Sequence, residues 1–174
     1  MKILPPPIWA ILALIALYFA SELGPFMNWP SWRSQPLGAL IFILGMIGPA
    51  IAIFQFRRAG TEVSPTSQTN SKLVVAGIYR LTRNPMYLGL TIASFGIALF
   101  FGRPLMFLAP LFVFAITNWI FIPFEEAKMR RQYGDQFYAY AKLVRRWLYA
   151  AARFFCFVSG GAGGGPAIGA CAGK

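Results

Sequence analysis

Two long segments of this sequence contain no charged residue, and they constrain the fold more than any other feature. They cover residues 36–56 and 105–123, and each is close to the roughly 20 residues that a helix needs to cross the hydrocarbon core of a bilayer. Only 12% of the 174 residues are charged and 57% are hydrophobic, against about 25% and 45–50% in soluble domains. The pattern argues against a water-soluble globule and predicts a membrane protein.

Two shorter apolar segments cover residues 4–20 and 85–101. The first opens with consecutive prolines, which fit only the entry of a helix; Lys2 before it and small residues after it are also typical of a signal peptide. The second reaches the 105–123 segment through a short turn, which predicts a helical hairpin. The expected fold is therefore all-α, a polytopic membrane protein with about four transmembrane helices.

The chain carries sixteen Lys and Arg against five acids, a net charge of +11. Cytoplasmic loops retain Lys and Arg, and a cytoplasmic N-terminus places all of them except Arg33 and Arg103 on that side. Both termini, the loop over residues 57–84 and the region over 124–153 are then cytoplasmic. Because most of these charges flank apolar segments, we expect contacts with membrane lipids and no nucleic-acid partner.

The region over residues 124–153 has apolar residues at steps of three and four, which predicts an amphipathic helix or a pair of helices. From residue 159 to 174 the chain is mostly Gly and Ala, a composition expected to be disordered. We therefore expect one domain over residues 1–158. The sequence has no His, which excludes Ser-His-Asp catalysis and the usual zinc sites, and no metal site is expected.

The densest polar motif lies at the start of the third apolar segment. Asn84 and Pro85 favour a helix start, with Asn as the capping acceptor and Pro where no donor is needed. Arg80 and Arg83 precede this start, and cations beside free N–H groups predict a site for a carboxylate or phosphate. The alternative is structural: both arginines anchor the protein to the membrane surface, and Asn84 is only a cap.

Two further residues of the motif follow inside the expected helix. Tyr87 either belongs to the site or is an aromatic residue of the membrane interface. Gly89 would let another backbone or a flat ligand approach closely.

The second polar motif is Glu125-Glu126, which we expect at a helix entry after Pro123. Acids favour a helix N-terminus, and Glu126 with Arg130 forms an i,i+4 pair, so a structural role is possible. In the functional alternative, one glutamate accepts hydrogen bonds from a ligand. Arg146 either pairs in bidentate fashion with a substrate carboxylate or contacts lipid headgroups.

Together, residues 77–89, Glu125-Glu126, Tyr133-Gly134 and Arg146-Trp147 resemble the isoprenylcysteine carboxyl methyltransferase family, in particular its bacterial members. The resemblance covers about residues 60–148, including an upstream loop at 60–65. Three positions depart from the family pattern and leave the acceptor open. They are Asn84, where eukaryotic members have His, Phe137, where Tyr is common, and Arg145, where Pro is frequent.

The resemblance implies an S-adenosylmethionine-dependent enzyme of a bacterial inner membrane that methylates, on the cytoplasmic side, a carboxylate of a lipid-like or isoprenoid acceptor. It implies that the cofactor pocket is shaped by Arg83, Asn84, Pro85, Tyr87, Gly89, Glu125 and Glu126. It makes Arg80 and Arg146 the candidates for orienting the acceptor or the carboxylate of the cofactor.

Three other functions stay open at this point. Phospholipid N-methyltransferases have a similar membrane architecture and would act on an amine. Membrane reductases of the steroid-reductase type keep a related motif at a helix entrance and use NADPH. In a non-enzymatic membrane scaffold, every motif would serve only topology and helix capping.

Overall fold

The computed structural model describes residues 5–23, 31–58 and 73–148, and all regular elements of that part of the chain are helical. The predicted all-α class is therefore confirmed. The Gly/Ala-rich tail and residues 60–65 lie outside the described residues. The elements in chain order are α1 (Pro6–Ser21), α2 (Gln35–Arg58), η2 (Gly77–Arg80), α3 (Pro85–Phe101), η3 (Pro104–Phe107), α4 (Leu108–Ile116), η4 (Thr117–Phe121), α5 (Ile122–Tyr133) and α6 (Asp135–Leu143).

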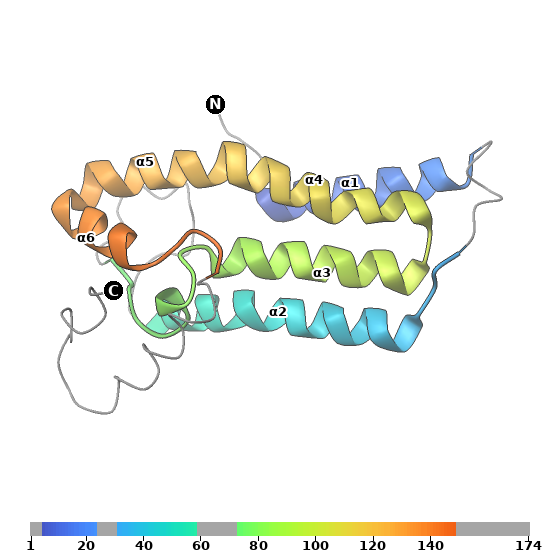
Figure 1. Ribbon diagram of the computed structural model, residues 1–174, viewed down its shortest axis with the longest axis horizontal. Coiled ribbons are helices and arrows are strands. Elements are labelled where there is room, and N and C mark those ends of the chain that lie inside the picture. The colour runs from blue at the N-terminus through green and yellow to red at the C-terminus, as the bar shows by residue number, and fades with distance from the viewer. Residues whose placement is uncertain (1–4, 24–30, 59–72, 149–174) are drawn as a thin grey trace, which may run out of the picture.

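Helices α2 and α3 form the closest pair in the bundle, running in opposite directions side by side (Figure 1). A Cβ atom on Gly45 of α2 would lie 2.5 Å from the Ala93 nitrogen, and one on Gly96 of α3 would lie 2.5 Å from the Phe42 nitrogen. Small residues at such positions let two backbones approach closely, which is how helices associate in an apolar solvent. The glycines of these two helices thus form the packing surface of the bundle.

The outer surface of the bundle is strongly apolar. Two helices, Gln35–Arg58 and Pro104–Tyr133, are long and apolar enough to span a membrane, whereas α1 and α3 are apolar but shorter. Most large side chains of α2 are exposed, among them Leu40, Ile43 and Phe54 at 53%, 59% and 61%. Such a continuous apolar exterior is typical of a helix in contact with lipid.

The fourth apolar segment is longer than the sequence predicts. Instead of ending at residue 123, the helix runs without a break over Pro104–Tyr133, seen in Figure 1 as one rod across the top of the bundle. Pro123 would clash with a carbonyl in a regular helix, but it lies two residues after η4, a π turn. There the Ile122 N–H donates to the Thr117 carbonyl, five residues back, and the wider turn accommodates the proline.

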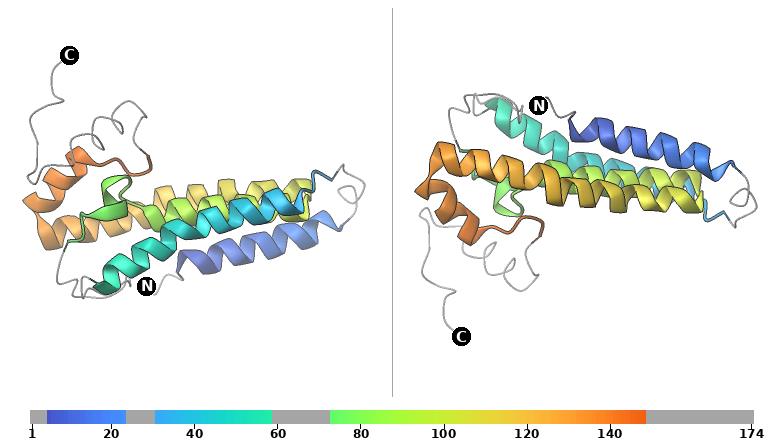
Figure 2. Two further views of the ribbon diagram at one scale, coloured as in Figure 1. Left: turned by 90° about the horizontal axis from the view of Figure 1, so that it is seen from below. Right: turned by 90° about the horizontal axis from the view of Figure 1, so that it is seen from above.

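Helix α5 ends at a sharp turn. Gly134 has φ 49° and ψ −123°, a conformation that glycine adopts far more readily than other residues. The chain then reverses into α6, so the predicted amphipathic region is a pair of helices up to residue 143. After α6 the backbone becomes extended at Val144; we call residues 144–148 the strap. Figures 1 and 2 show the strap returning from α6 toward the start of α3.

The turn after α3 and the packing of α1 complete the bundle. Gly102, at φ 71°, ends α3 in the left-handed conformation and leads into Pro104–Tyr133, which confirms the predicted hairpin. Helix α1 packs against this hairpin, and its Leu14 is buried with Ala98, Met106 and Ala109. The right-hand view of Figure 2 shows α1 alongside the long helix.

Candidate functional site

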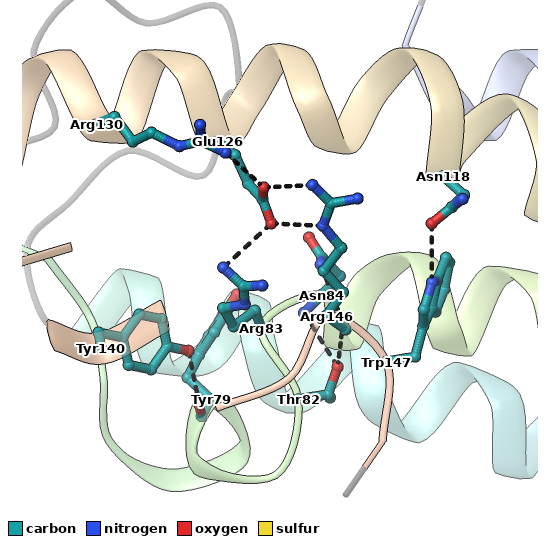
Figure 3. Close-up of polar contacts among 10 residues, drawn as sticks. All are labelled: Tyr79, Thr82, Arg83, Asn84, Asn118, Glu126, Arg130, Tyr140, Arg146 and Trp147. Atoms are coloured by element: carbon teal, nitrogen blue, oxygen red, sulfur yellow. Dashed lines mark hydrogen bonds and ion pairs between the residues drawn. The ribbon is translucent and has the colours of Figure 1, made fainter. Parts of the chain in front are cut away.

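The loop that leads into α3 is fastened to the strap (Figure 3). Thr82 Oγ1 and Asn84 Nδ2 both donate to the Arg146 carbonyl, at 2.9 and 3.0 Å. The Arg83 N–H donates to the Arg145 carbonyl at 3.0 Å. Residues more than sixty positions apart in sequence are thus joined by three hydrogen bonds.

The predicted capping role of Asn84 is wrong. Asn84 stands at the N-cap position of α3, but its side chain makes no cap hydrogen bond within the described part of the chain. Its backbone, at φ −128° and ψ 58°, lies away from the extended conformation usual for a capping residue. The side chain is therefore turned to the strap, and the Asn84 N–H instead donates to Thr82 Oγ1 at 3.1 Å.

Glu126 is the centre of a cluster of three arginines (Figure 3). Arg146 binds it in bidentate fashion, with Nε to Oε1 at 2.9 Å and an Nη to Oε2 at 2.7 Å. Arg83 lies 3.2 Å and Arg130 3.1 Å from the same carboxylate. The Arg130 contact confirms the predicted i,i+4 pair. Because the bidentate partner of Arg146 is Glu126, this geometry gives the guanidinium a positioning role.

The three arginines exceed the charge of the single carboxylate that they bind, so the cluster keeps a positive surplus. Burial lowers the pKa of the Arg83 guanidinium, and Glu126 opposes this shift; an arginine still remains protonated under such conditions. The hydrogen bond to Glu126 raises the pKa of Arg146. The buried Arg83 Nε has no hydrogen-bond partner among the described residues. Its N–H can therefore donate a hydrogen bond to an anionic group.

Glu125 has a different partner from its neighbour. The Tyr87 hydroxyl, from α3, donates to the Glu125 carboxylate in α5. Tyr87 is buried and packs against Phe121 and Ile122. The two adjacent acids lie inside a continuous helix, about two turns before its end at Tyr133. They do not stand at the helix entry that the sequence predicts, because Pro123 does not interrupt the helix.

A cavity lies between these groups and the end of α2. It encloses about 550 Å³ of empty space, a figure that includes the solvent in its mouth. Its lining joins charged groups with aromatic and aliphatic side chains: Phe56, Leu73, Val74, Tyr79, Arg83, Asn84, Glu125, Glu126, Met129, Tyr133, Phe137 and Tyr140. This is the composition of a small-molecule site, in which few polar groups orient a ligand against apolar walls.

The structure brings together most of the residues that the resemblance names. Four of them line the cavity: Arg83, Asn84, Glu125 and Glu126. Tyr87 joins them through Glu125, and Pro85 is the first residue of α3. We call residues 73–84 the motif loop. It is joined to α6, because the Tyr140 hydroxyl donates to the Tyr79 carbonyl at 2.7 Å.

Five predicted site residues lie outside the cavity lining: Pro85 and Tyr87, described above, and Arg80, Gly89 and Arg146. Arg80 is exposed in η2, and Arg146 stands behind Glu126. Gly89 faces α2, where a Cβ atom would collide with Pro49 and the Gly45 carbonyl. We expected either another backbone or a flat ligand to approach Gly89 closely, and the structure shows the backbone of α2 there. On that face, α2 occupies the space that a flat ligand would need.

Sequence reasoning missed two polar contacts of the site. Thr82 sits inside the motif, yet its hydroxyl gives no sequence signal for a strap 64 positions away. Asn118 lies in a segment that reads as purely transmembrane, but its Oδ1 accepts from Trp147 Nε1 at 3.1 Å. A polar amide within an apolar span was the available signal, since such groups need a partner in lipid.

Tyr87→Phe tests the contact between α3 and α5. It removes the donor to Glu125 and leaves a largely buried carboxyl without that partner, so we expect a loss of about 1–3 kcal/mol of stability. The measurement is the unfolding midpoint in detergent. Tyr138→Phe, at a side chain that is 52% exposed, is the matched control. Equal midpoints for the two variants would contradict the contact.

Comparison with known proteins assigns the chain to a protein family. The phospholipid methyltransferase family profile matches residues 34–136, which include the α2–α3 pair, the motif loop and both glutamates. The chain belongs to this family. The match begins just before α2, so α1 and the strap lie outside it. The predicted membership of a methyltransferase family is thereby confirmed.

The chain is also similar to plant proteins. It is 31% identical over 118 residues to protein-S-isoprenylcysteine O-methyltransferase B of Arabidopsis thaliana, covering 65% of this chain and 58% of that protein. It is 30% identical over 122 residues to a probable protein-S-isoprenylcysteine O-methyltransferase of Oryza sativa subsp. indica, covering 67% and 62%. The matched region thus spans about three fifths of these relatives. No solved structure matches the chain.

Proposed function

We propose that this protein is an S-adenosylmethionine-dependent methyltransferase that acts on a carboxylate of a lipid-like, isoprenylcysteine-like acceptor at the cytoplasmic membrane face. Support comes from membership of a methyltransferase family and from relatives named as isoprenylcysteine O-methyltransferases. The observation that carries the proposal is the cavity at one end of an apolar bundle, whose lining residues except Phe137 and Tyr140 come from the family's matched region.

The cavity residues fit the chemistry of this cofactor. The buried Arg83 Nε lacks a partner among the described residues and suits a carboxylate. Glu125 suits an ammonium or hydroxyl group, and the aromatic lining suits a flat base. Bound there, S-adenosylmethionine supplies an electrophilic methyl group. In our proposal Arg83, Asn84 and Glu125 contact the cofactor, Tyr87 and Pro85 shape the pocket from α3, and Gly89 allows the close packing of α3 on α2.

The remaining groups position reactants without moving a proton. A carboxylate acceptor is already ionised at neutral pH, so it needs no general base, which suits a chain without His. The rate then depends on proximity, orientation and exclusion of water. We assign Arg80, exposed beside the site, to the acceptor carboxylate. Arg146 holds Glu126 in place through its bidentate contact.

We further propose that four helices cross the membrane, with both termini in the cytoplasm. The arrangement supports this, because Arg103 forms an ion pair with Glu22 and Gly102 packs against Arg33, all at the end opposite the cavity. The two cations expected outside therefore share one end of the bundle. The resemblance to bacterial members makes a bacterial inner membrane our proposed location.

Calorimetric titration of the detergent-purified protein with S-adenosylhomocysteine tests the cofactor. We expect binding in the wild type and at least a tenfold rise in Kd for Glu125→Gln, because the carboxylate charge is lost from the cavity. Glu22→Gln, an acid at the far end of the bundle, should bind like the wild type. Absence of binding in folded wild-type protein would refute the proposal, and binding of NADPH in a parallel titration would favour a reductase.

A second candidate acceptor is a phospholipid amine, favoured by the family's own description as phospholipid methyltransferases. The two products differ chemically, since a methyl ester is hydrolysed by alkali and an N-methyl group is not. Membranes incubated with methyl-labelled S-adenosylmethionine should release volatile label after alkali treatment. Label that stays in the lipid after alkali would replace the carboxylate acceptor with the amine.

A further inference from the structure

The strap has one attachment that belongs to neither the motif loop nor the arginine cluster. Trp147 donates its indole N–H to Asn118 Oδ1 at 3.1 Å, and Figure 3 shows this contact on the side of the strap away from Glu126. Asn118 belongs to η4, within the apolar part of the long helix. The attachment therefore connects the strap directly to the membrane-spanning helix.

Besides this amide, Trp147 contacts several aromatic and aliphatic side chains. Its ring lies 4.7 Å from that of Phe114, and it packs against the cluster of Tyr87, Phe121 and Ile122. An indole offers a single donor and no acceptor. Leaving this donor unpaired in an apolar setting costs free energy. The hydrogen bond to Asn118 therefore stabilises the Trp147 side chain in its observed position.

The π turn brings Asn118 and Glu126 toward the same side of the helix. Eight positions separate them, and in a regular α-helix such residues lie about 80° apart around the axis. A π turn absorbs about one extra residue, which reduces the difference to about 20°. One helix face can therefore hold Trp147 through Asn118 and the adjacent Arg146 through Glu126.

We propose that Asn118 is a positioning residue for the cofactor site, an inference that rests on the proposed function. Its hydrogen-bond partner Trp147 is not among the residues that line the cavity. By fixing Trp147 it holds the strap against the motif loop, and the strap in turn keeps Arg146 on Glu126 and Arg83 in the cavity wall. Without this attachment, the strap separates more often from the loop and the cofactor site loses its preformed geometry.

Two variants remove the contact from opposite sides. Asn118→Leu removes the acceptor, and Trp147→Phe removes the donor but retains an aromatic ring. We expect each to raise the Kd for S-adenosylhomocysteine about tenfold, and the double variant to add little, because both act on one interaction. Asn118→Asp keeps an oxygen acceptor and should stay within about threefold of the wild type. Trp119→Phe, at an exposed residue of the same turn, is the control for Trp147→Phe.

Hydrogen exchange gives a readout that does not need cofactor. In Asn118→Leu, peptides covering residues 82–84 and 144–148 should exchange about tenfold faster, while the α2–α3 pair stays protected. Wild-type exchange in both single variants would overturn the proposal, as would losses that simply add in the double variant. If the wild type binds no S-adenosylhomocysteine, the proposed function fails, and the exchange data alone decide whether Asn118 holds the strap.

Discussion

Glu126→Gln should be the most damaging single substitution in the site. The side chain of Glu126 is only 8% exposed and faces three guanidinium groups, of which that of Arg83 belongs to a side chain that is 14% exposed. Removing one partner of a buried pair leaves an uncompensated charge, at a cost of about 3 kcal/mol. For a chain of this size we expect the unfolding midpoint in detergent to fall by about 6–12 °C, together with the loss of S-adenosylhomocysteine binding.

The control for this variant is an acid at the opposite end of the bundle. Glu22 pairs with Arg103, and their side chains are 36% and 31% exposed. Such accessible pairs contribute about 0–1 kcal/mol, so Glu22→Gln should change the midpoint by a few degrees at most. Equal changes in the two variants would show that Glu126 does not organise the site.

Gly89→Leu should disrupt the helix pair rather than fill the cavity. The new side chain would collide with Pro49 and with the Gly45 backbone, neither of which can move like a flexible side chain. Overpacking of this kind costs about 1–3 kcal/mol or more. We expect normal membrane insertion, because the segment becomes no less apolar, but a clearly lower unfolding midpoint and a lower yield of folded protein.

Gly48→Ala is the milder comparison, because its Cβ would lie 3.1 Å from the Pro85 carbonyl oxygen and need only a small adjustment. Alkaline extraction of membranes reports insertion, and thermal unfolding reports packing. A Gly89→Leu protein with a wild-type midpoint and weakened cofactor binding would instead place Gly89 at the pocket, as the resemblance implies.

The sequence predicts the apolar helices well where strong local signals bound them. Helix α3 begins at Pro85 and ends at Phe101, as predicted, because proline fits the first helical position and Gly102 adopts the left-handed conformation that ends a helix. Both glutamates and Arg83 could be placed at one site because the motifs lie at the same end of the expected hairpin.

Other parts of the site depend on contacts that no local pattern reveals. Pro123 reads as a helix boundary, yet the preceding π turn lets the helix continue, and no residue type signals a π turn. Asn84 has the chemistry of a cap, but the distant Arg146 carbonyl competes for its side chain. The strap has no periodicity to predict, since the hydrogen bonds that fix it come from the motif loop and from Asn118.

The length of the unbroken helix over Pro104–Tyr133 determines how far its end extends from the hydrocarbon core of the bilayer. Its 30 residues extend about 45 Å, whereas the hydrocarbon core of a bilayer is about 30 Å thick. When the apolar part of this helix fills the core, the last turns, which carry Glu125 and Glu126, extend beyond it to the depth of the lipid headgroups. A thicker bilayer would draw these turns inward while the motif loop stays at the surface, so the geometry of the cavity should depend on acyl chain length.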